Sequence, residues 1–173
     1  MRLISTITLF LWVMSVSAQK KLKYDIIKST GDTLFRTSEK RLYTHAGGSK
    51  ALGEILESTV YKSKNGISLA IDIQTGRTNT FTIKEGSRIQ LKQKNGESVS
   101  LYANSYNSSR NSLLGYGCTM LVFYRVSKKD ITQLKSSPID FIVIQSSTGD
   151  MDYQLKEKAG DIIPEQLTRI EQD

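Results

Sequence analysis

The chain has 173 residues, a formal net charge of +7, one cysteine and one histidine. This length suits one domain with a substantial hydrophobic core, and a single thiol excludes an intramolecular disulfide, so the core must supply the stability. The lone imidazole of His45 excludes metal sites built from several histidines and catalytic schemes that need two of them.

The first 18 residues have the pattern of a secretory signal peptide. Arg2 supplies a positive start, residues 3–14 are mostly apolar, and small residues precede Gln19. The apolar stretch is too short to span a membrane, so we predict cleavage between Ala18 and Gln19, an uncleaved anchor being the alternative. No later run approaches about 20 apolar residues, so no transmembrane segment is expected in the mature chain. The prediction is an exported protein, periplasmic or extracellular, with a single α+β domain over residues 19–173.

The charge is distributed unevenly along the chain. Residues 19–128 contain 18 Lys and Arg against 8 Asp and Glu, whereas residues 129–173 contain 5 against 9. An exported basic surface meets anionic glycans and lipid head groups more often than nucleic acid, so nucleic acid is not an expected partner. The alternative is a solvated basic surface with an acidic tail that folds back on it.

In the first half of the chain, a clear secondary-structure pattern begins only at residue 57. Residues 22–27 are a weak strand candidate, and residues 50–56 have apolar side chains at helical spacing, which predicts one or two helical turns. Strands are then predicted at residues 57–63, 67–73 and 79–83, because apolar and polar side chains alternate between turns that contain glycine.

The register of the hairpin around Asn95-Gly96 can be derived from its apolar residues. A two-residue loop would place Leu91 opposite Ser100 and put the apolar sets of the two strands on different faces. A three-residue loop over residues 94–96 pairs Leu91 with Val99 and gives both strands one apolar face. We therefore predict the three-residue loop, with Gly96 in a left-handed conformation.

The outward face of this hairpin carries the candidate binding residues. Arg88 and Lys92 alternate out of one strand, and Tyr102 lies at the edge of the other. Such a cationic strip with an aromatic edge suits an acidic glycan or a phosphate group. The alternative is an ordinary solvated sheet face.

Two apolar runs, residues 119–126 and 139–144, are the clearest strands of the chain. Apolar residues occupy odd and even positions in both, so both are expected to be central and covered on both faces. Between them Ser127 and Asp130 form a capping-box pattern, which predicts a short helix that ends before Pro138. The 12 residues between the strands are the lower limit for a parallel crossover, whereas the other connections suit antiparallel hairpins.

The chain is expected to end in a strand and a helix. Residues 104–117 are polar and without periodicity, which predicts a loop. A short strand follows around residues 151–155, and a C-terminal helix begins near Asp161 or Pro164, with its apolar stripe at Ile163, Leu167 and Ile170. The fold class is therefore α+β: a mostly antiparallel, hairpin-rich sheet or sandwich with a short helix between two central strands and a C-terminal helix.

One part of this pattern resembles a known group of proteins. The features are a tyrosine-containing strand, Ser-Lys-Lys-Asp-Ile at residues 127–131, Ser-Pro-Ile at residues 137–139, and a Gly-Asp turn before a lysine-bearing tail and final helix. Over residues 81–171 the chain resembles uncharacterised exported proteins common in Bacteroidetes, and its Ala18-Gln19 junction is similar to their cleavage sites. The resemblance implies no activity, and Val143 stands where the group often has arginine, so no functional residue is transferred.

No catalytic set is expected, although several residue pairs have side chains that could act as catalytic groups or metal ligands. Cys118 is interpreted as a buried structural thiol, and the alternative is a nucleophile with His45 as its base, 73 positions away. Asp150 and Asp152 alternate as calcium ligands do but lack the rest of a calcium loop.

Two further patterns are also weak. Glu54 and Glu57 form a carboxylate pair only if their segment is helical. Residues 46–50 have a glycine-rich, lysine-ending loop without the phosphate-loop spacing. The sequence therefore predicts no metal site and no cofactor.

These observations favour one functional hypothesis. It is an exported non-enzymatic module with a binding or structural role at the cell envelope, which engages an anionic glycan, a phosphate group or another envelope protein. The alternative is a small exported hydrolase that uses Cys118 or a serine as nucleophile.

Overall fold

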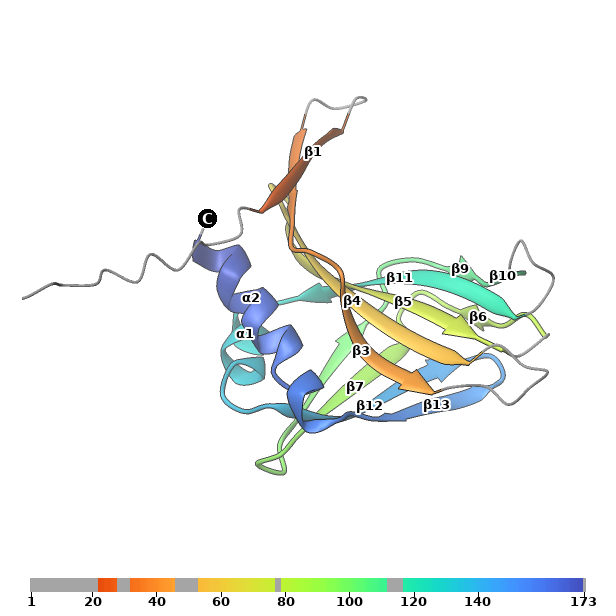
Figure 1. Cartoon of the computed structure of the whole chain (residues 1–173). Helices are drawn as coiled ribbons and strands as arrows, with labels where there is room; N and C mark the ends of the chain where they lie inside the picture. Colours follow the sequence, from red (N-terminus) through yellow and green to blue (C-terminus); the bar gives the residue numbers. More distant parts are fainter. Residues whose placement is uncertain (1–21, 28–31, 46–52, 77–78, 112–116, 173) are drawn as a thin grey trace, which may run out of the picture.

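The structure, a computed structural model, describes residues 22–27, 32–45, 53–76, 79–111 and 117–172 (Figure 1). The proposed signal peptide, its Ala18-Gln19 cleavage site and the glycine-rich loop at residues 46–50 lie outside these described residues. The described part is mostly antiparallel β-sheet with two α-helices, one of them at the C-terminus, which confirms the α+β class.

The first sheet has seven strands in the described residues, and all its neighbours are antiparallel. Its order is β1-β2-β4-β5-β11-β10, and β3 pairs with β4 further along the same edge as β2. The strands are β1 (Lys23–Ile27), β2 (Asp32–Arg36), β3 (Lys40–His45), β4 (Glu54–Ser63), β5 (Gly66–Thr75), β10 (Arg110–Asn111) and β11 (Cys118–Val126).

The second sheet has four strands in the order β13-β12-β7-β8. It joins the first sheet where Ala103 bridges Tyr124 and the Asn104 N–H donates to the Phe123 carbonyl at 2.9 Å. β6 and β9 form a separate short pair. The strands are β6 (Thr82–Ile83), β7 (Arg88–Gln93), β8 (Ser98–Tyr102), β9 (Asn107–Ser108), β12 (Ile139–Ser146) and β13 (Gly149–Gln154).

The predicted register of the β7–β8 hairpin is confirmed. Leu91 lies opposite Val99, Ile89 lies opposite Leu101, and all four side chains are buried. Gly96 has a φ of 87°, a left-handed conformation that glycine adopts without steric cost. The hairpin therefore contributes one apolar face to the core, as the alternation requires.

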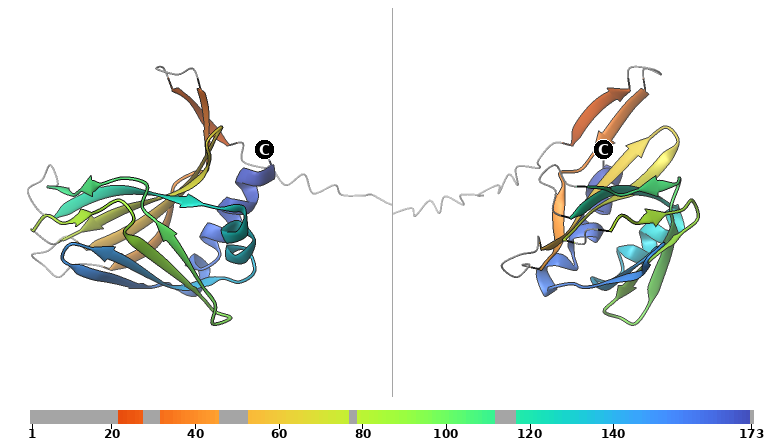
Figure 2. Two further views of the ribbon diagram at one scale, coloured as in Figure 1. Left: turned by 180° about the vertical axis from the view of Figure 1, so that it is seen from behind. Right: turned by 90° about the vertical axis from the view of Figure 1, so that its right-hand side faces the viewer.

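The helices lie at one end of the two sheets (Figure 2). α1 (Lys128–Leu134) begins with the predicted capping box, since Asp130 N–H donates to Ser127 Oγ at 3.2 Å and Asp130 Oδ2 accepts from Ser127 N–H at 2.9 Å. A short 3₁₀ turn, η1 (Glu157–Ala159), precedes α2 (Ile162–Gln172).

The apolar stripe of the C-terminal helix is confirmed. Ile163, Leu167 and Ile170 are fully buried, and α2 packs against β4. A buried polar contact fixes this packing, because Ser58 Oγ donates to Gln166 Oε1 at 2.8 Å and Gln166 Nε2 donates to the Ser58 carbonyl at 3.0 Å.

Two predictions about the clearest strands are wrong. β11 and β12 lie in different sheets, so the linker is not a parallel crossover within one sheet. α1 instead carries the chain from one sheet to the other while it contacts β8 and α2. Neither strand is covered on both faces: Leu121 is 46% exposed, and Phe141 and Val143 are only half-buried. A half-buried sheet face also accepts apolar residues, so an apolar run does not distinguish a strand covered on one face from a strand covered on both.

The predicted helical turn before residue 57 is also wrong. The described part of that segment begins with Gly53, and β4 extends from Glu54 between β3 and β5. Pairing on both sides outweighs the local helical spacing. The predicted loop before β11 includes the short strands β9 and β10 among its described residues. None of the helices in the described ranges is long and apolar enough to cross a membrane.

Candidate functional site

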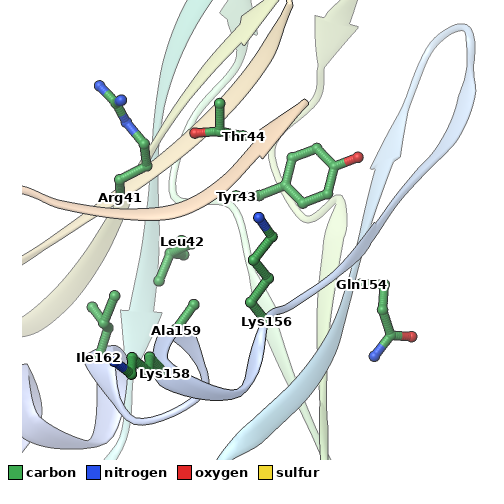
Figure 3. A pocket seen from close by; sticks show the side chains of 9 residues that line it. All are labelled: Arg41, Leu42, Tyr43, Thr44, Gln154, Lys156, Lys158, Ala159 and Ile162. Atoms are coloured by element: carbon green, nitrogen blue, oxygen red, sulfur yellow. The ribbon is translucent and has the colours of Figure 1, made fainter. Parts of the chain in front are cut away.

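The two sheets leave a groove between β3 and β13. Within the described residues β3 pairs only with β4, and β13 pairs only with β12, so each strand keeps one edge without backbone pairing. A groove of about 330 Å³ lies beside these edges and continues along η1 to the start of α2 (Figure 3). Its lining consists of Arg41, Leu42, Tyr43, Thr44, Gln154, Lys156, Lys158, Ala159 and Ile162.

A β-bulge shapes the β3 side of the groove. The register moves from Arg41 opposite Glu57 to Tyr43 opposite Leu56, so Leu42 is an extra residue in the strand. A bulge of this kind bends the strand and redirects its side chains, and here Leu42 is buried against the core. The Tyr43 ring packs edge-on against the Tyr153 ring of β13, with centroids 5.1 Å apart and an interplanar angle of 69°. This ring pair links the two sheets across the groove.

The opposite side of the groove is held by backbone contacts. Leu155 N–H donates to the Asp140 carbonyl at 2.9 Å, and Ile139 N–H donates to the Gly160 carbonyl at 2.9 Å. These bonds bracket η1 and tie it to the start of β12. Gly160 packs closely there, because a Cβ at this position would lie 2.5 Å from the Ile139 carbonyl oxygen. The segment that carries Lys156 and Lys158 is therefore fixed at both ends.

Glu157, which lies between the two lysines in the sequence, pairs with a residue outside the groove. Glu157 forms an ion pair with Lys94 at 3.6 Å, and Lys94 belongs to the β7–β8 turn. Figure 3 shows the Lys156 side chain extending from the β13–η1 connection toward β3. The groove lining thus contains three cations, Arg41, Lys156 and Lys158, and no carboxylate.

The three cations differ in their pairing. Arg41 Nε donates to Glu57 Oε1 at 3.0 Å. Lys156 and Lys158 form no ion pair with any residue that the structure describes. The interaction between the Glu39 and Glu57 carboxyl groups raises the pKa of Glu39, and together with the Arg41 guanidinium it lowers the pKa of Glu57. Glu57 is therefore the ionised partner of Arg41, and the uncompensated positive charge belongs to the two lysines.

The floor of the groove is apolar. Tyr43, Ala159 and Ile162 are half-buried and pack against the hydrophobic core, while Leu42 is buried beneath them. A cation beside an apolar, partly dehydrated wall attracts an anion more strongly than the same cation in open water. The arrangement can hold a negatively charged group by charge-assisted hydrogen bonds from the lysines.

The predicted binding residues lie elsewhere, on the outward face of β7 and β8. Arg88 lies opposite Tyr102, which is 56% exposed, so the structure brings these two together. Lys92 Nζ lies 5.4 Å from the centroid of the Phe141 ring, and its charge is partly engaged there. All three predicted residues are exposed.

The structure confirms Cys118 as a buried thiol and separates it from His45, its partner in the alternative dyad. Cys118 is buried, and its Sγ lies 3.5 Å from Asn111 Oδ1 and 3.7 Å from the Asn79 carbonyl oxygen. His45 is exposed at the end of β3, and β4 and β5 lie between it and the strand of Cys118. Three strand spacings correspond to ~14 Å between backbones, too far for proton transfer between these side chains.

The two carboxylate pairs, which the sequence left as weak alternatives, do not form sites. Glu54 and Glu57 belong to a strand, and three residues apart along a strand places them on opposite faces. Asp150 and Asp152 are exposed on one face of β13. Among the described ranges no group of three His, Cys, Asp or Glu could hold a metal ion.

Sequence reasoning missed the residues that line the groove. Lys156 and Lys158 follow the last strand at alternate positions, and this was the available signal. Their place in the groove depends on β3, which lies more than 110 residues earlier in the chain. Comparisons with protein-family models, curated proteins and solved structures find no match to the chain.

Proposed function

We propose that the chain is an exported, non-enzymatic module that binds an anionic component of the cell envelope through the groove between β3 and β13. One observation carries the proposal: Lys156 and Lys158 have no ion pair in the described residues and lie in a groove without a carboxylate. Hydrogen bonds to a charged group contribute roughly 1.5–3 kcal/mol each, so two ammonium groups account for a weak affinity, with a Kd on the order of 1 mM.

The setting of this activity is part of the proposal. Export is supported by the signal-peptide pattern of residues 1–18 and by the resemblance to exported proteins of Bacteroidetes. The basic composition of residues 19–128 would attract the protein to anionic envelope surfaces. We treat the two sheets as a sandwich-like shell, with a short helix between two of its interior strands, that presents the groove.

The outward face of β7 and β8 is a second candidate for the same activity. Arg88 beside the exposed ring of Tyr102 favours it, because an aromatic edge next to a guanidinium can hold a charged sugar. Lys92 contributes less to this face, since it lies over Phe141.

Isothermal titration calorimetry with glucose 6-phosphate and with glucose tests the function. The probe adds one phosphate to a neutral sugar, so glucose is the matched ligand control. Glucose 6-phosphate should bind in low salt and weaken as salt rises, whereas glucose should not bind. If neither glucose 6-phosphate nor methyl phosphate gives a phosphate-dependent heat, the proposal is overturned.

Two double variants locate the binding. Lys156→Gln with Lys158→Gln should reduce the affinity for glucose 6-phosphate at least tenfold. Arg88→Gln with Lys92→Gln removes the same charge from another exposed face and should leave it within twofold. The reverse pattern would assign the function to β7 and β8.

The hydrolase alternative makes a separate prediction. It requires covalent labelling of Cys118 or of a serine by thiol- or serine-directed probes in the folded protein. The binding proposal expects less labelling of the folded protein than of an unfolded control, because Cys118 is 1% exposed.

A further inference from the structure

Resting on the proposed function, we propose that the ligand of the β3–β13 groove is an amphipathic anion. Its charged head, a phosphate or a carboxylate, is held by Lys156 and Lys158, and an alkyl chain lies on the apolar floor. The inference names the chemical class of the ligand: a short-chain alkyl phosphate or fatty-acid-like molecule rather than a charged sugar.

The first argument is the composition of the floor. Tyr43, Ala159 and Ile162 are apolar side chains that pack on the core yet stay half-exposed in this one groove. Exposed apolar surface beside a core is unfavourable in water, and a ligand that covers it gains roughly 25 cal/mol per Å². A polar ligand would leave this gain unused.

The second argument is the shortage of polar partners for a sugar. The uncharged polar side chains of the lining are Thr44 and Gln154, apart from the Tyr43 hydroxyl. Gln154 Nε2 already donates to the Asp140 carbonyl at 3.1 Å and to Asp140 Oδ1 at 2.9 Å. A sugar ring needs several hydrogen-bond partners to replace its water, and the floor would bury its hydroxyls without them.

The third argument is geometric. Lys156 extends toward β3, so its ammonium group lies on the Tyr43 side of the lining, away from Ile162 (Figure 3). Long cationic side chains cover apolar surface with their stems and keep the charge outside. The charged head of an amphiphile would therefore lie at the ammonium group, and its alkyl chain would lie on the apolar floor.

The size of the groove limits the chain. A volume of about 330 Å³ is at the lower end of small-molecule sites, which span ~300–1,000 Å³. The groove suits a short alkyl chain, or the first part of a longer chain whose end remains outside.

The test is a calorimetric series of alkyl phosphates, from methyl to hexyl phosphate, all below their micelle concentrations. Affinity should rise about two- to fourfold per added methylene, and hexyl phosphate should bind more than tenfold tighter than glucose 6-phosphate. Hexanol, which lacks the charge, should bind at least tenfold more weakly than hexyl phosphate.

Two single variants separate the floor from the head. Ile162→Thr should flatten the dependence on chain length while methyl phosphate binds as before. Ile67→Thr is the matched control, because Ile67 is also half-buried against the core but does not line the groove. Thermal melts of both variants verify that they fold.

The outcomes distinguish this inference from the proposed function. If all phosphates bind with the same affinity regardless of the chain, the amphipathic ligand is wrong while phosphate binding stands. If no phosphate binds, or if hexanol binds as tightly as hexyl phosphate, the proposed anion-binding function fails.

Discussion

Two cationic regions of the molecule can be compared, the groove between β3 and β13 and the outward face of β7 and β8. Both carry exposed basic side chains, and both lie next to tyrosines. In the groove the cations stand beside half-buried apolar side chains from β3, η1 and α2. On the hairpin Arg88 and Lys92 alternate along one exposed strand face, where Lys92 lies over the ring of Phe141. Positive charge alone therefore does not distinguish the two regions, and our proposal for the groove rests on its apolar side chains as well.

The largest expected difference between the regions concerns two glycines. Gly160→Ala should lower the free energy of unfolding by about 1–3 kcal/mol, because the new Cβ would lie 2.5 Å from the Ile139 carbonyl oxygen and the backbone must move. Gly96→Ala in the β7–β8 turn should cost about 1 kcal/mol, from its φ of 87° alone, since nothing lies within 4 Å. Urea denaturation of both variants measures the difference.

This prediction also separates the regions functionally. Gly160→Ala should weaken phosphate binding as well, since it displaces the segment that carries the lysines, whereas Gly96→Ala should not. Equal loss of stability in both variants, with binding retained in both, would mean that the backbone contact at Gly160 does not position the groove.

A smaller difference is expected from the aromatic contacts of the two regions. The Tyr43–Tyr153 pair joins the two sheets, and a double-mutant cycle with Tyr43→Leu and Tyr153→Leu should give a coupling of about 0.5–1.5 kcal/mol. The Lys92–Phe141 contact lies within one sheet at an exposed site, and Lys92→Met with Phe141→Leu should give about 0.5 kcal/mol. A coupling near zero for the tyrosines would show that they do not hold the groove together.

The smallest effect is a pH dependence beside the groove. The interaction with Glu39 and the Arg41 guanidinium lower the pKa of Glu57. The ionised Glu57 therefore stabilises the fold at pH values above its ordinary pKa, and this stabilisation is lost as the pH falls through the lowered pKa. Arg41→Gln should raise the pKa of Glu57 and reduce the loss of stability at acid pH by a fraction of a kcal/mol, because the Arg41 side chain is 57% exposed and solvent screens its charge. Carboxyl NMR titration measures the shift, with Arg88→Gln as the control that leaves Glu57 unchanged. A Glu57 pKa that does not rise in Arg41→Gln would contradict the assigned pairing.

The local parts of the fold were accessible from the sequence. The register of β7 and β8 followed from the faces of Leu91 and Val99, and the α1 capping box from Ser127 and Asp130. These features depend on residues close in the chain. The positions of β11 and β12 in different sheets depend on long-range pairing, which apolar alternation does not encode.

The candidate site could not be predicted from the sequence, because it too depends on contacts between distant parts of the chain. Arg88, Lys92 and Tyr102 could be placed on one face because a hairpin brings near neighbours together. The groove combines a bulged strand with a segment far along the chain, and its apolar floor is visible only as incomplete burial of Tyr43 and Ile162. Partial burial is a property of the packed sheets rather than of any local pattern.

The most direct measurement is the mapping of amide chemical shifts by NMR during a titration with hexyl phosphate. The account predicts shifts that concentrate at residues 41–44 and 156–162 and saturate with a single affinity, while residues 88–92 and 98–102 stay unchanged. Shifts centred on β7 and β8, or spread evenly over the basic surface, would contradict it.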